Sequence, residues 1–414
     1  MREGQLDHLW KVSLVAVLCL VAFGVGLLSS LSAPAALASS PSEVGLGAGI
    51  YEITKTYGAT VFDYDGDGRP DILLGRHYAA PPRLYRNNGD GTFTDLSPLA
   101  FPATVHDRHG CDAADVNQDG LSDLYCATGG HKGGWGTHWN ELWLQRPDGS
   151  FTQQSEAYGV DDPYGRGREV AFLDANGDPY PDLYVGNTYP REDRFRSPNR
   201  FFINKAGQAF RPAPELGLDR EIGAFSVQAI DFDGKWGDDL LVCGHRANGV
   251  TALHLYRQLP DGRFLDATRR WNASGRCKFA RLADMNGDRR PDLIVLSRTK
   301  LKVKIQRVVG RSFAGPRYVR SADARDFAVG DVNGDHRNDI FLQHAGPAGH
   351  LPPDMVLLNH RRARGFTRLN VPQPAGGVAD AVTPIDYDGN GLTDFVVENG
   401  RNKAEARVEL IAFH

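Results

Sequence analysis

A nine-residue acidic pattern that recurs seven times constrains this chain more than any other feature of its sequence. Each copy starts and ends with aspartate, and the third position is Asp or Asn in every copy. A short apolar, β-prone run follows each copy. The copies start at Asp63, Asp115, Asp174, Asp231, Asp284, Asp331 and Asp386. Recurrence at a period of roughly 50 residues is typical of repeat proteins in which each repeat is one supersecondary unit.

A second landmark follows the acidic pattern within each repeat. An alternating strand leads into a glycine-containing turn and then into a strand that opens with an aromatic residue, as in LYRNNGDGTFTDLS over residues 84–97. This order predicts a hairpin. The aromatic residues are Phe93, Phe151, Phe210, Phe264, Phe313 and Phe366.

One repeat therefore reads as strand, acidic loop, strand, connection, strand, glycine turn and strand, without a convincing helical period. Seven such repeats predict an all-β fold, a seven-bladed β-propeller with four-stranded antiparallel blades. In this arrangement the acidic loops and the glycine turns share one face of the propeller. The other connections lie on the opposite face.

The last repeat lacks room for its fourth strand, because the expected aromatic strand falls beyond His414. The sequence GIYEIT at 49–54 is similar to GTFTDL at 91–96, which opens the fourth strand of repeat 1. We expect the N-terminal segment to complete the last blade, which protects a sheet edge that is otherwise exposed. The predicted propeller covers residues 49–414, and residues 39–48 form a short linker.

Residues 1–38 have the features of a secretory signal peptide. Residues 12–28 are apolar or small, and Ala36, Leu37 and Ala38 precede the expected cleavage position. The flanking region carries little net positive charge, so an uncleaved signal anchor is the alternative. Either reading places the repeats in a secreted or extracytoplasmic location, and we identify no other segment that could span a membrane.

The cysteine count is consistent with an oxidising compartment. Four cysteines remain after Cys19 is removed with the signal, and four allow three pairings. Cys111 and Cys126 flank the second acidic loop, so a hairpin through that loop brings them together. We expect the pairs Cys111–Cys126 and Cys243–Cys277, with buried free thiols as the alternative.

The acidic loops have the composition of calcium sites. Clustered carboxylates repel one another unless a cation lies between them, and flexible oxygen-rich coordination suits Ca²⁺. By analogy with the EF-hand loop, we expect side-chain ligands at positions one, three, five and nine and glycine at position six. Repeats 1, 2 and 7 meet this requirement: Asp63, Asp65, Asp67 and Asp71; Asp115, Asn117, Asp119 and Asp123; and Asp386, Asp388, Asn390 and Asp394.

The other four loops depart from the pattern. Repeats 3, 5 and 6 replace the glycine by Pro179, Arg289 and His336 but keep the ligands: Asp174, Asn176, Asp178 and Asp182; Asp284, Asn286, Asp288 and Asp292; and Asp331, Asn333, Asp335 and Asp339. Repeat 4 has Lys235 at position five, and we expect its ammonium group to replace the cation. The chain is therefore predicted to bind three to six calcium ions in a structural role.

The pattern D-x-[DN]-x-[DN]-G-x-x-D followed by an apolar strand resembles the FG-GAP or VCBS repeat of integrin α-subunit propellers. The segment LYRNNGDGTFTD is similar to the corresponding repeat segment of the cartilage acidic protein family and its bacterial relatives. The resemblance covers about 45–414. It implies an extracellular, calcium-binding propeller with a role in adhesion or as a scaffold, and it implies no reaction.

The face opposite the acidic loops is the expected ligand surface, because its connections are long and differ between repeats. It would carry His77, His131, His245, His344, Tyr78, Trp135, Trp139, Tyr189, Arg191, Arg194 and Arg196. Arginine and aromatic residues suit recognition, although ordinary solvated loops are the alternative.

Two functional classes remain open at this point. The first is a non-catalytic adhesion or recognition module for an extracellular protein or an acidic glycan. The second is a lyase-like or hydrolase-like carbohydrate-active enzyme that uses His109, Arg166 and Arg168. No spacing identifies a nucleophile or an acid–base pair, so no catalytic residue is assigned. A formal net charge of −4 provides no basic footprint for nucleic acid.

Overall fold

The structure, a computed structural model, describes most of the chain beyond residue 39. The described residues are 40–77, 81–104, 106–129, 139–188, 198–220, 222–245, 250–297, 300–307, 312–321, 324–344, 353–371, 380–400 and 406–414. They belong to one compact unit, Ala36–His414. The signal sequence predicted over 1–38 lies outside the described residues.

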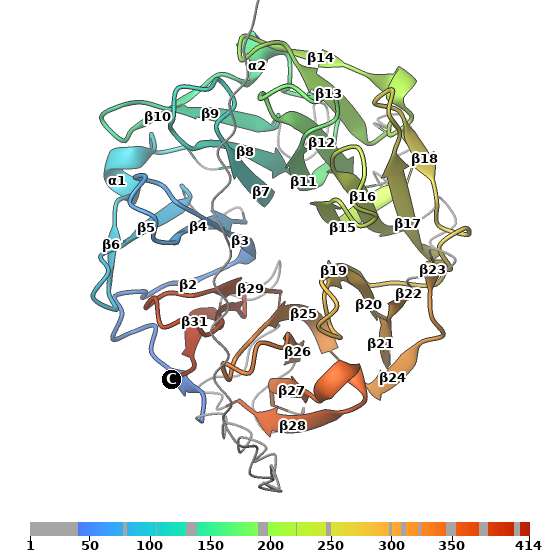
Figure 1. Ribbon diagram of the computed structural model, residues 1–414. Helices are drawn as coiled ribbons and strands as arrows, with labels where there is room; N and C mark the ends of the chain where they lie inside the picture. The colour runs from blue at the N-terminus through green and yellow to red at the C-terminus, as the bar shows by residue number, and fades with distance from the viewer. Residues whose placement is uncertain are drawn as a thin grey trace, which may run out of the picture. The chain divides into compact units, whose positions relative to one another are not determined.

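Seven sheets of four main strands form this unit, and all the strand pairs are antiparallel (Figure 1). The first four blades contain β3 (Thr56–Phe62), β4 (Asp71–Arg76), β5 (Arg83–Asn87) and β6 (Phe93–Asp95); β7 (Arg108–Ala114), β8 (Asp123–Thr128), β9 (Glu141–Gln145) and β10 (Phe151–Gln153); β11 (Gly167–Leu173), β12 (Asp182–Asn187), β13 (Arg200–Asn204) and β14 (Phe210–Pro212); and β15 (Gly223–Ile230), β16 (Asp239–His245), β17 (Thr251–Gln258) and β18 (Phe264–Asp266).

The last three blades follow the same order. They contain β19 (Phe279–Ala283), β20 (Asp292–Leu296), β21 (Lys300–Lys304) and β24 (Arg317–Arg320); β25 (Ala324–Gly330), β26 (Asp339–His344), β27 (Met355–Asn359) and β28 (Phe366–Asn370); and β29 (Ala381–Ile385), β30 (Asp394–Glu398), β31 (Ala406–Ala412), β1 (Ser42–Glu43) and β2 (Ile53–Thr54). Three single-turn helices follow the fourth strands of blades 1 to 3, namely α1 (Ser97–Ala100), α2 (Ser155–Tyr158) and η1 (Pro214–Leu216), and η2 (Arg361–Ala363) lies between β27 and β28.

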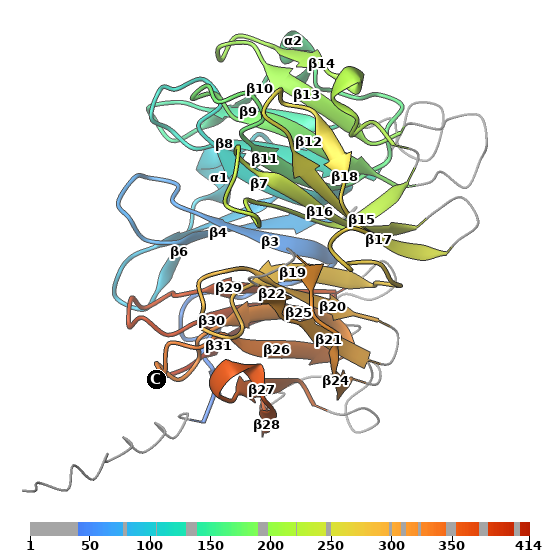
Figure 2. The same ribbon diagram turned by 45° about the vertical axis from the view of Figure 1, so that its right-hand side comes forward.

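The blades close into a ring through their first strands. Each of the strands β3, β7, β11, β15, β19, β25 and β29 contacts the first strand of the next blade, and β29 contacts β3 (Figures 1 and 2). Seven separate hydrophobic clusters fill the spaces between successive blades. The all-β, seven-bladed propeller predicted from the repeats is confirmed.

The N-terminal segment pairs with the last blade in a different way from the one we predicted. We expected one strand over 49–54, but β1 pairs with the end of β31 and β2 pairs with its beginning. A turn at residues 45–49 separates the two short strands. Part of the segment predicted as a linker, Ser42–Glu43, is therefore a strand of the last blade.

Blade 5 also departs from the predicted order. A short hairpin of β22 (Gln306–Arg307) and β23 (Ser312–Phe313) is inserted before β24. Phe313 was predicted to open the fourth strand, but it lies in this hairpin and packs against Trp271, with ring centroids 5.8 Å apart. The fourth strand of blade 5 is instead the exposed segment β24.

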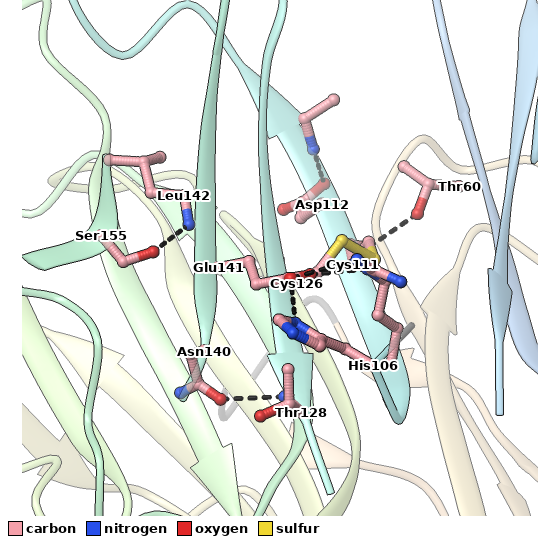
Figure 3. Close-up of a disulfide and its surroundings, with 12 residues drawn as sticks. Thr60, His106, Cys111, Asp112, Cys126, Thr128, Asn140, Glu141, Leu142 and Ser155 are labelled. Atoms are coloured by element: carbon pink, nitrogen blue, oxygen red, sulfur yellow. Dashed lines mark hydrogen bonds and ion pairs between the residues drawn. A yellow bond between two sulfur atoms is a disulfide. The ribbon is translucent and has the colours of Figure 1, made fainter. Parts of the chain in front are cut away.

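Both predicted disulfides are present. Cys111 and Cys126 lie opposite each other in β7 and β8, and the Thr60 hydroxyl of β3 donates a hydrogen bond to the Cys111 carbonyl at 2.9 Å (Figure 3). Cys243 in β16 bonds to Cys277, which immediately precedes blade 5. The second disulfide therefore joins blade 4 to blade 5 covalently.

Removing the disulfide between blades is expected to destabilise the protein more than removing the one within a blade. The sequence separations are 34 and 15 residues, and loop-closure entropy assigns about 3.8 and about 3 kcal/mol to them. Urea unfolding of Cys243→Ser/Cys277→Ser, with Cys111→Ser/Cys126→Ser as the matched control, measures both losses. If the first variant unfolds with the same urea midpoint as the wild-type protein, the structural role of this disulfide is contradicted.

Candidate functional site

The ninth-position aspartate of every acidic loop ties the loop to the third strand of its own blade. All seven side chains are buried, and one oxygen of each accepts the backbone N–H of loop position two. The other oxygen accepts a backbone N–H at the end of the third strand or within two residues after it, at distances of 2.6–2.9 Å. In blade 1 the donors are Tyr64 and Asn87, and the acceptor is Asp71.

A second set of contacts carries this connection to the preceding blade. The side-chain amide of the same third-strand residue donates to a loop carbonyl of the blade before it. Gln145 of blade 2, for example, donates to the Tyr64 carbonyl of blade 1 at 3.0 Å. The six residues that do this are Asn87, Gln145, Asn204, Gln258, Gln306 and Asn359. Sequence reasoning missed them, although the recurrence of Asn or Gln at this point was a readable signal.

The first-position aspartate organises the loop itself. In blade 1 the carboxylate of Asp63 accepts the N–H groups of Gly66, Asp67 and Gly68 at 2.9–3.1 Å. In the described residues, one carboxylate oxygen from each of three loop aspartates lies within 4.8 Å of the others in blades 1, 4 and 7. Blades 2, 3, 5 and 6 have Asn at position three, so their oxygen donors include an amide.

The oxygen donors of these loops are chemically suited to a calcium ion. Burial is the largest cause that raises the pKa of Asp71 to about 6. Burial also raises the pKa to about 7 for Asp123, Asp182, Asp239, Asp292, Asp339 and Asp394. Each of these carboxylates accepts two N–H groups yet lies beside further carboxylates, and a carboxylate has lone pairs to spare for a cation. A hard divalent ion would compensate this charge.

Arginine competes for the fifth-position carboxylate in three loops. Arg69, Arg290 and Arg337 each form an ion pair with the aspartate two residues earlier. The predicted ligands Asp67, Asp288 and Asp335 are therefore shared with a guanidinium group in blades 1, 5 and 6. The sequence reading did not anticipate this competition.

Blade 4 compensates its carboxylates differently from the way we expected. Asp231, Asp233 and Asp239 come together, but the ion pair with Asp233 is made by Arg257 of β17, with Nε and Oδ2 2.6 Å apart. Lys235 contributes its backbone N–H to Asp231 at 3.1 Å. The cation beside this cluster is therefore an arginine from the third strand, and the absence of calcium in blade 4 stays a prediction.

The backbone shows why glycine was expected at position six. Gly68, Gly120 and Gly391 have positive φ, and Trp236, Arg289 and His336 adopt the same conformation at φ values of 59–64°. Non-glycine residues in this region are strained. Position four, which was not singled out from the sequence, has positive φ in all seven loops and carries glycine in six of them. Pro179 is excluded from this conformation by its ring.

A second cluster lies where the end of β4 in blade 1 meets the start of β7 in blade 2. His77, Asp107 and His109 are buried, and one potential ligand atom of each lies within 4.8 Å of the others. His77 Nδ1 hydrogen-bonds to Asp107, and the distance from His109 Nε2 to Asp107 Oδ1 is 3.3 Å. Two imidazoles and a carboxylate suit a transition metal better than calcium.

The surroundings set the charges in this cluster. Burial, together with the charge of Arg168, lowers the pKa of His109 to about 4. Burial opposes ionisation of Asp107, but hydrogen bonds with His109 and His77 outweigh it and hold its pKa below the ordinary value. His109 Nδ1 is 2.7 Å from the Gly167 carbonyl and must donate to it. With its proton on Nδ1, His109 can donate from Nε2 to Asp107 only when the imidazole is protonated.

Tyr57 and Arg168 connect this cluster to a central cavity. The Tyr57 ring lies edge-on to both imidazoles, with centroids 4.8 and 4.2 Å away. The Arg168 guanidinium lies 5.1 Å from the centre of the Tyr57 ring, and its Nη1 is 3.5 Å from His109 Nε2. Both residues line the cavity, whose volume is about 460 Å³.

Charged side chains from several blades line this cavity. The cations are Arg168, Lys278, Arg281 and Arg325, and the carboxyl groups are Glu169, Asp326 and Asp380. Burial raises the pKa of Glu169 to about 8, against the opposing charge of Arg281. Glu169 is therefore mostly protonated at neutral pH, and the cationic groups outnumber the anionic ones.

The structure brings together some of the residues predicted for the ligand face and for the enzyme alternative. His77 and His109 meet, and His245 lines the central cavity with Arg168. His344 is buried, and its backbone N–H donates to Asp354. Arg166 donates to the Gly129 carbonyl at 3.2 Å, and Trp139 is exposed. Tyr78, His131, Trp135, Tyr189, Arg191, Arg194 and Arg196 lie outside the described residues.

Sequence reasoning missed Tyr57, Asp107, Glu169 and the cavity groups of the later blades. Their common feature is a charged or aromatic residue within or just before the first strand of a repeat, ahead of the acidic loop. A strand that is buried among other strands normally carries apolar residues there. Charges at these positions were therefore a usable signal for a polar cavity at the ring axis.

Comparisons with known proteins agree with the repeat geometry. The family model described as FG-GAP-like repeat matches residues 63–126, 115–185 and 284–342. This β-propeller contains FG-GAP-like repeats in the matched segments. Cartilage acidic protein 1 of Xenopus tropicalis is 23% identical over 400 residues, which cover 84% of this chain and 58% of that protein. The chain thus spans little more than half the length of this relative.

Two further likenesses are more limited. Integrin alpha-7 of Rattus norvegicus is 28% identical over 205 residues, which cover 46% of this chain and 16% of that protein. A solved Agrocybe aegerita lectin structure, described as recognising non-reducing terminal N-acetylglucosamine, aligns with 77% of this chain and 81% of its own. Its identity is 14% and its TM-score is 0.48, and a likeness this weak supports no conclusion about this FG-GAP propeller.

The buried carboxyl groups predict an unusual pH dependence for the metal-free protein. Their pKa values are about 6 to 8 in the folded chain, against ordinary values of 3.8 and 4.5. The folded state binds these protons more tightly, so in EDTA the free energy of unfolding should rise as the pH falls from 8 to 5. Saturating calcium should flatten the trend by holding the loop carboxylates ionised. Urea unfolding across this range tests the prediction, and a free energy that falls on acidification in EDTA would contradict it.

Proposed function

We propose that this FG-GAP propeller is an extracytoplasmic, calcium-stabilised recognition module that binds an extracellular protein or an acidic glycan without transforming it. The observation that carries the proposal is the central cavity, where four cationic groups and aromatic side chains converge from several blades. A concave site with a few converging polar groups is the usual form of a ligand-binding site.

Calcium has a structural part in this proposal. Six loops, those of blades 1, 2, 3, 5, 6 and 7, offer only oxygen side chains at positions one, three, five and nine. When bound, the ion would supply the positive charge that the clustered carboxylates lack. The loop carboxylates keep the second and third strands in register through the contacts of the ninth-position aspartate. Repeated, oxygen-saturated sites of this kind differ from a catalytic metal site, which keeps an open position.

An extracytoplasmic location is consistent with two observations and with one prediction from the sequence. Two disulfides join four cysteines, as is usual for proteins of oxidising compartments. The relatives include an integrin α-subunit and cartilage acidic protein 1. The signal sequence predicted at residues 1–38 would direct export. Across the described residues, no helix has the length and apolar character needed to cross a membrane.

Disrupting one complete acidic loop should remove one bound calcium ion and leave the other loops occupied. Asp63→Asn/Asp65→Asn should reduce the bound calcium by one ion per chain, because two of the converging ligands lose their charge. The matched blade 4 variant, Asp231→Asn/Asp233→Asn, should leave the count unchanged. Equilibrium dialysis with atomic absorption measures the stoichiometry.

EDTA should also lower the melting temperature of the wild-type protein. When free calcium is present at 100 times the dissociation constant of a site, binding at that site adds about 2.7 kcal/mol to the free energy of unfolding. An unchanged melting temperature, or an equal loss of calcium from the blade 4 variant, would contradict the proposed sites.

The cavity should determine ligand binding. Purified protein applied with calcium to an array of glycans and extracellular proteins should give a hit that Arg325→Ala weakens at least tenfold, a loss of about 1.4 kcal/mol. Arg325 is exposed and lines the cavity. The matched control is Arg276→Ala, an exposed arginine outside the cavity. Equal binding by both variants would contradict recognition at the cavity.

One observation keeps the carbohydrate-active enzyme as a second candidate. His109 and Arg168, which we singled out from the sequence, do meet at Tyr57 on the cavity wall. A tyrosine beside a cation could move a proton on an acidic sugar. Incubating each bound glycan with the protein and measuring its size separates the two candidates, because only an enzyme shortens the glycan.

A further inference from the structure

A cationic groove lies on the rim of the propeller, between blades 5 and 6. It has a volume of about 370 Å³ and runs between β24, the outer strand of blade 5, and the β27–β28 edge of blade 6 (Figure 1). Four arginines line it: Arg317, Arg320, Arg364 and Arg368. None of its lining residues is acidic.

These four guanidinium groups have no partners among the described residues. None of them forms an ion pair or a side-chain hydrogen bond there, and all four side chains are exposed. Arginines elsewhere on the surface do find acids: Arg211 pairs with Glu215 at 2.6 Å, and Arg263 pairs with Asp261 at 2.8 Å. The groove is therefore a place where like charges gather without internal compensation.

Such a gathering favours a multivalent anion. Each exposed pair of charges interacts only weakly in water, and salt screens it further. A ligand with several negative groups would neutralise several arginines at once. Guanidinium groups also bind sulfate and carboxylate oxygens through paired N–H donors.

An exposed aromatic ring beside the arginines indicates the kind of chain that carries those groups. Tyr318 is 59% exposed, and Lys300 Nζ lies 5.1 Å from its ring centre. Lys302 lies opposite Tyr318 in the pairing of β21 with β24, and Lys300 lies opposite Arg320. A flat ring among cations offers a stacking surface for a sugar as well as charge for its substituents.

We propose that this groove binds a linear polysaccharide that carries sulfate or carboxylate groups. Val319, Leu357 and Phe366 line the groove together with the arginines. The site is separate from the central cavity and does not depend on the ligand proposed there. It would hold the propeller on an acidic matrix while the cavity remains free.

Calorimetric titration with a heparin-type sulfated oligosaccharide, in calcium and 150 mM salt, tests the groove. The test variant is Arg317→Ser/Arg320→Ser/Arg364→Ser/Arg368→Ser. The control, Arg211→Ser/Arg263→Ser/Arg269→Ser/Arg276→Ser, removes the same charge from other exposed positions. We expect the test variant to weaken binding at least thirtyfold and the control to stay within threefold of the wild type. Both variants should keep the wild-type melting temperature, since the replaced groups are exposed.

Other outcomes would overturn the proposal. Absence of wild-type binding, or equal weakening in the two variants, would show that the groove has no special affinity for the oligosaccharide. Single-stranded DNA of equal charge and phosphatidylserine vesicles serve as competing probes. If either binds as tightly as the oligosaccharide and loses binding in the test variant, the groove is an unselective polyanion surface. An array hit that Arg325→Ala weakens and the groove variant does not belongs to the cavity, so the two proposals can fail separately.

Discussion

The ninth-position aspartate is the contact on which the rest of this propeller depends. Its buried carboxylate accepts one N–H from the acidic loop and one from the third strand, so it fixes how the second strand follows the first and how the third lies beside them. The Asn or Gln at the third-strand donor position then reaches the loop of the preceding blade. In blades 1 to 6 one carboxylate is thus linked both to the order within the blade and to the contact between blades, and in blade 7 it is linked to the order within the blade.

This arrangement has an electrostatic consequence. Ionising a buried carboxylate is costly, and further carboxylates lie beside it in the same loop. In blade 4 the guanidinium group of Arg257 forms an ion pair with one of the loop carboxylates. The complete loops instead offer oxygen donors that suit a divalent ion. The proposed calcium would therefore keep a ring of blades together without taking part in chemistry. The cavity at the ring axis and the groove on the rim remain free for ligands.

Much of the fold could be predicted because its information is local and repeated. The acidic pattern, the glycine turn and the aromatic strand are each read within one repeat, and seven copies make the blade count secure. The closing strands were placed less well, since β1 and β2 pair with β31 across more than 350 residues and carry little pattern of their own. The hairpin β22–β23 was missed because Phe313 imitates the aromatic residue that opens a fourth strand.

The site was predicted less completely, because it combines residues from several repeats. His77 and His109 were noticed, but nothing in their spacing shows that Asp107 joins them. Arg69 and Arg257 compete for loop carboxylates through contacts that depend on side-chain direction. The cavity gathers Arg168 and Arg325 from the first strands of blades 3 and 6 and Lys278 from just before the first strand of blade 5. Only the closed ring brings them together.

Amide hydrogen exchange at the donors to the ninth-position aspartates would test the central claim most directly. With calcium, Tyr64 and Asn87 of blade 1 should be strongly protected, and EDTA should speed their exchange because the carboxylate that holds them is no longer balanced by a cation. Phe232 and Gln258 of blade 4 should exchange at the same rate in both conditions, since Arg257 provides the charge there. Exchange that is unaffected by EDTA in all seven blades would contradict the claim that calcium and this carboxylate hold the ring together.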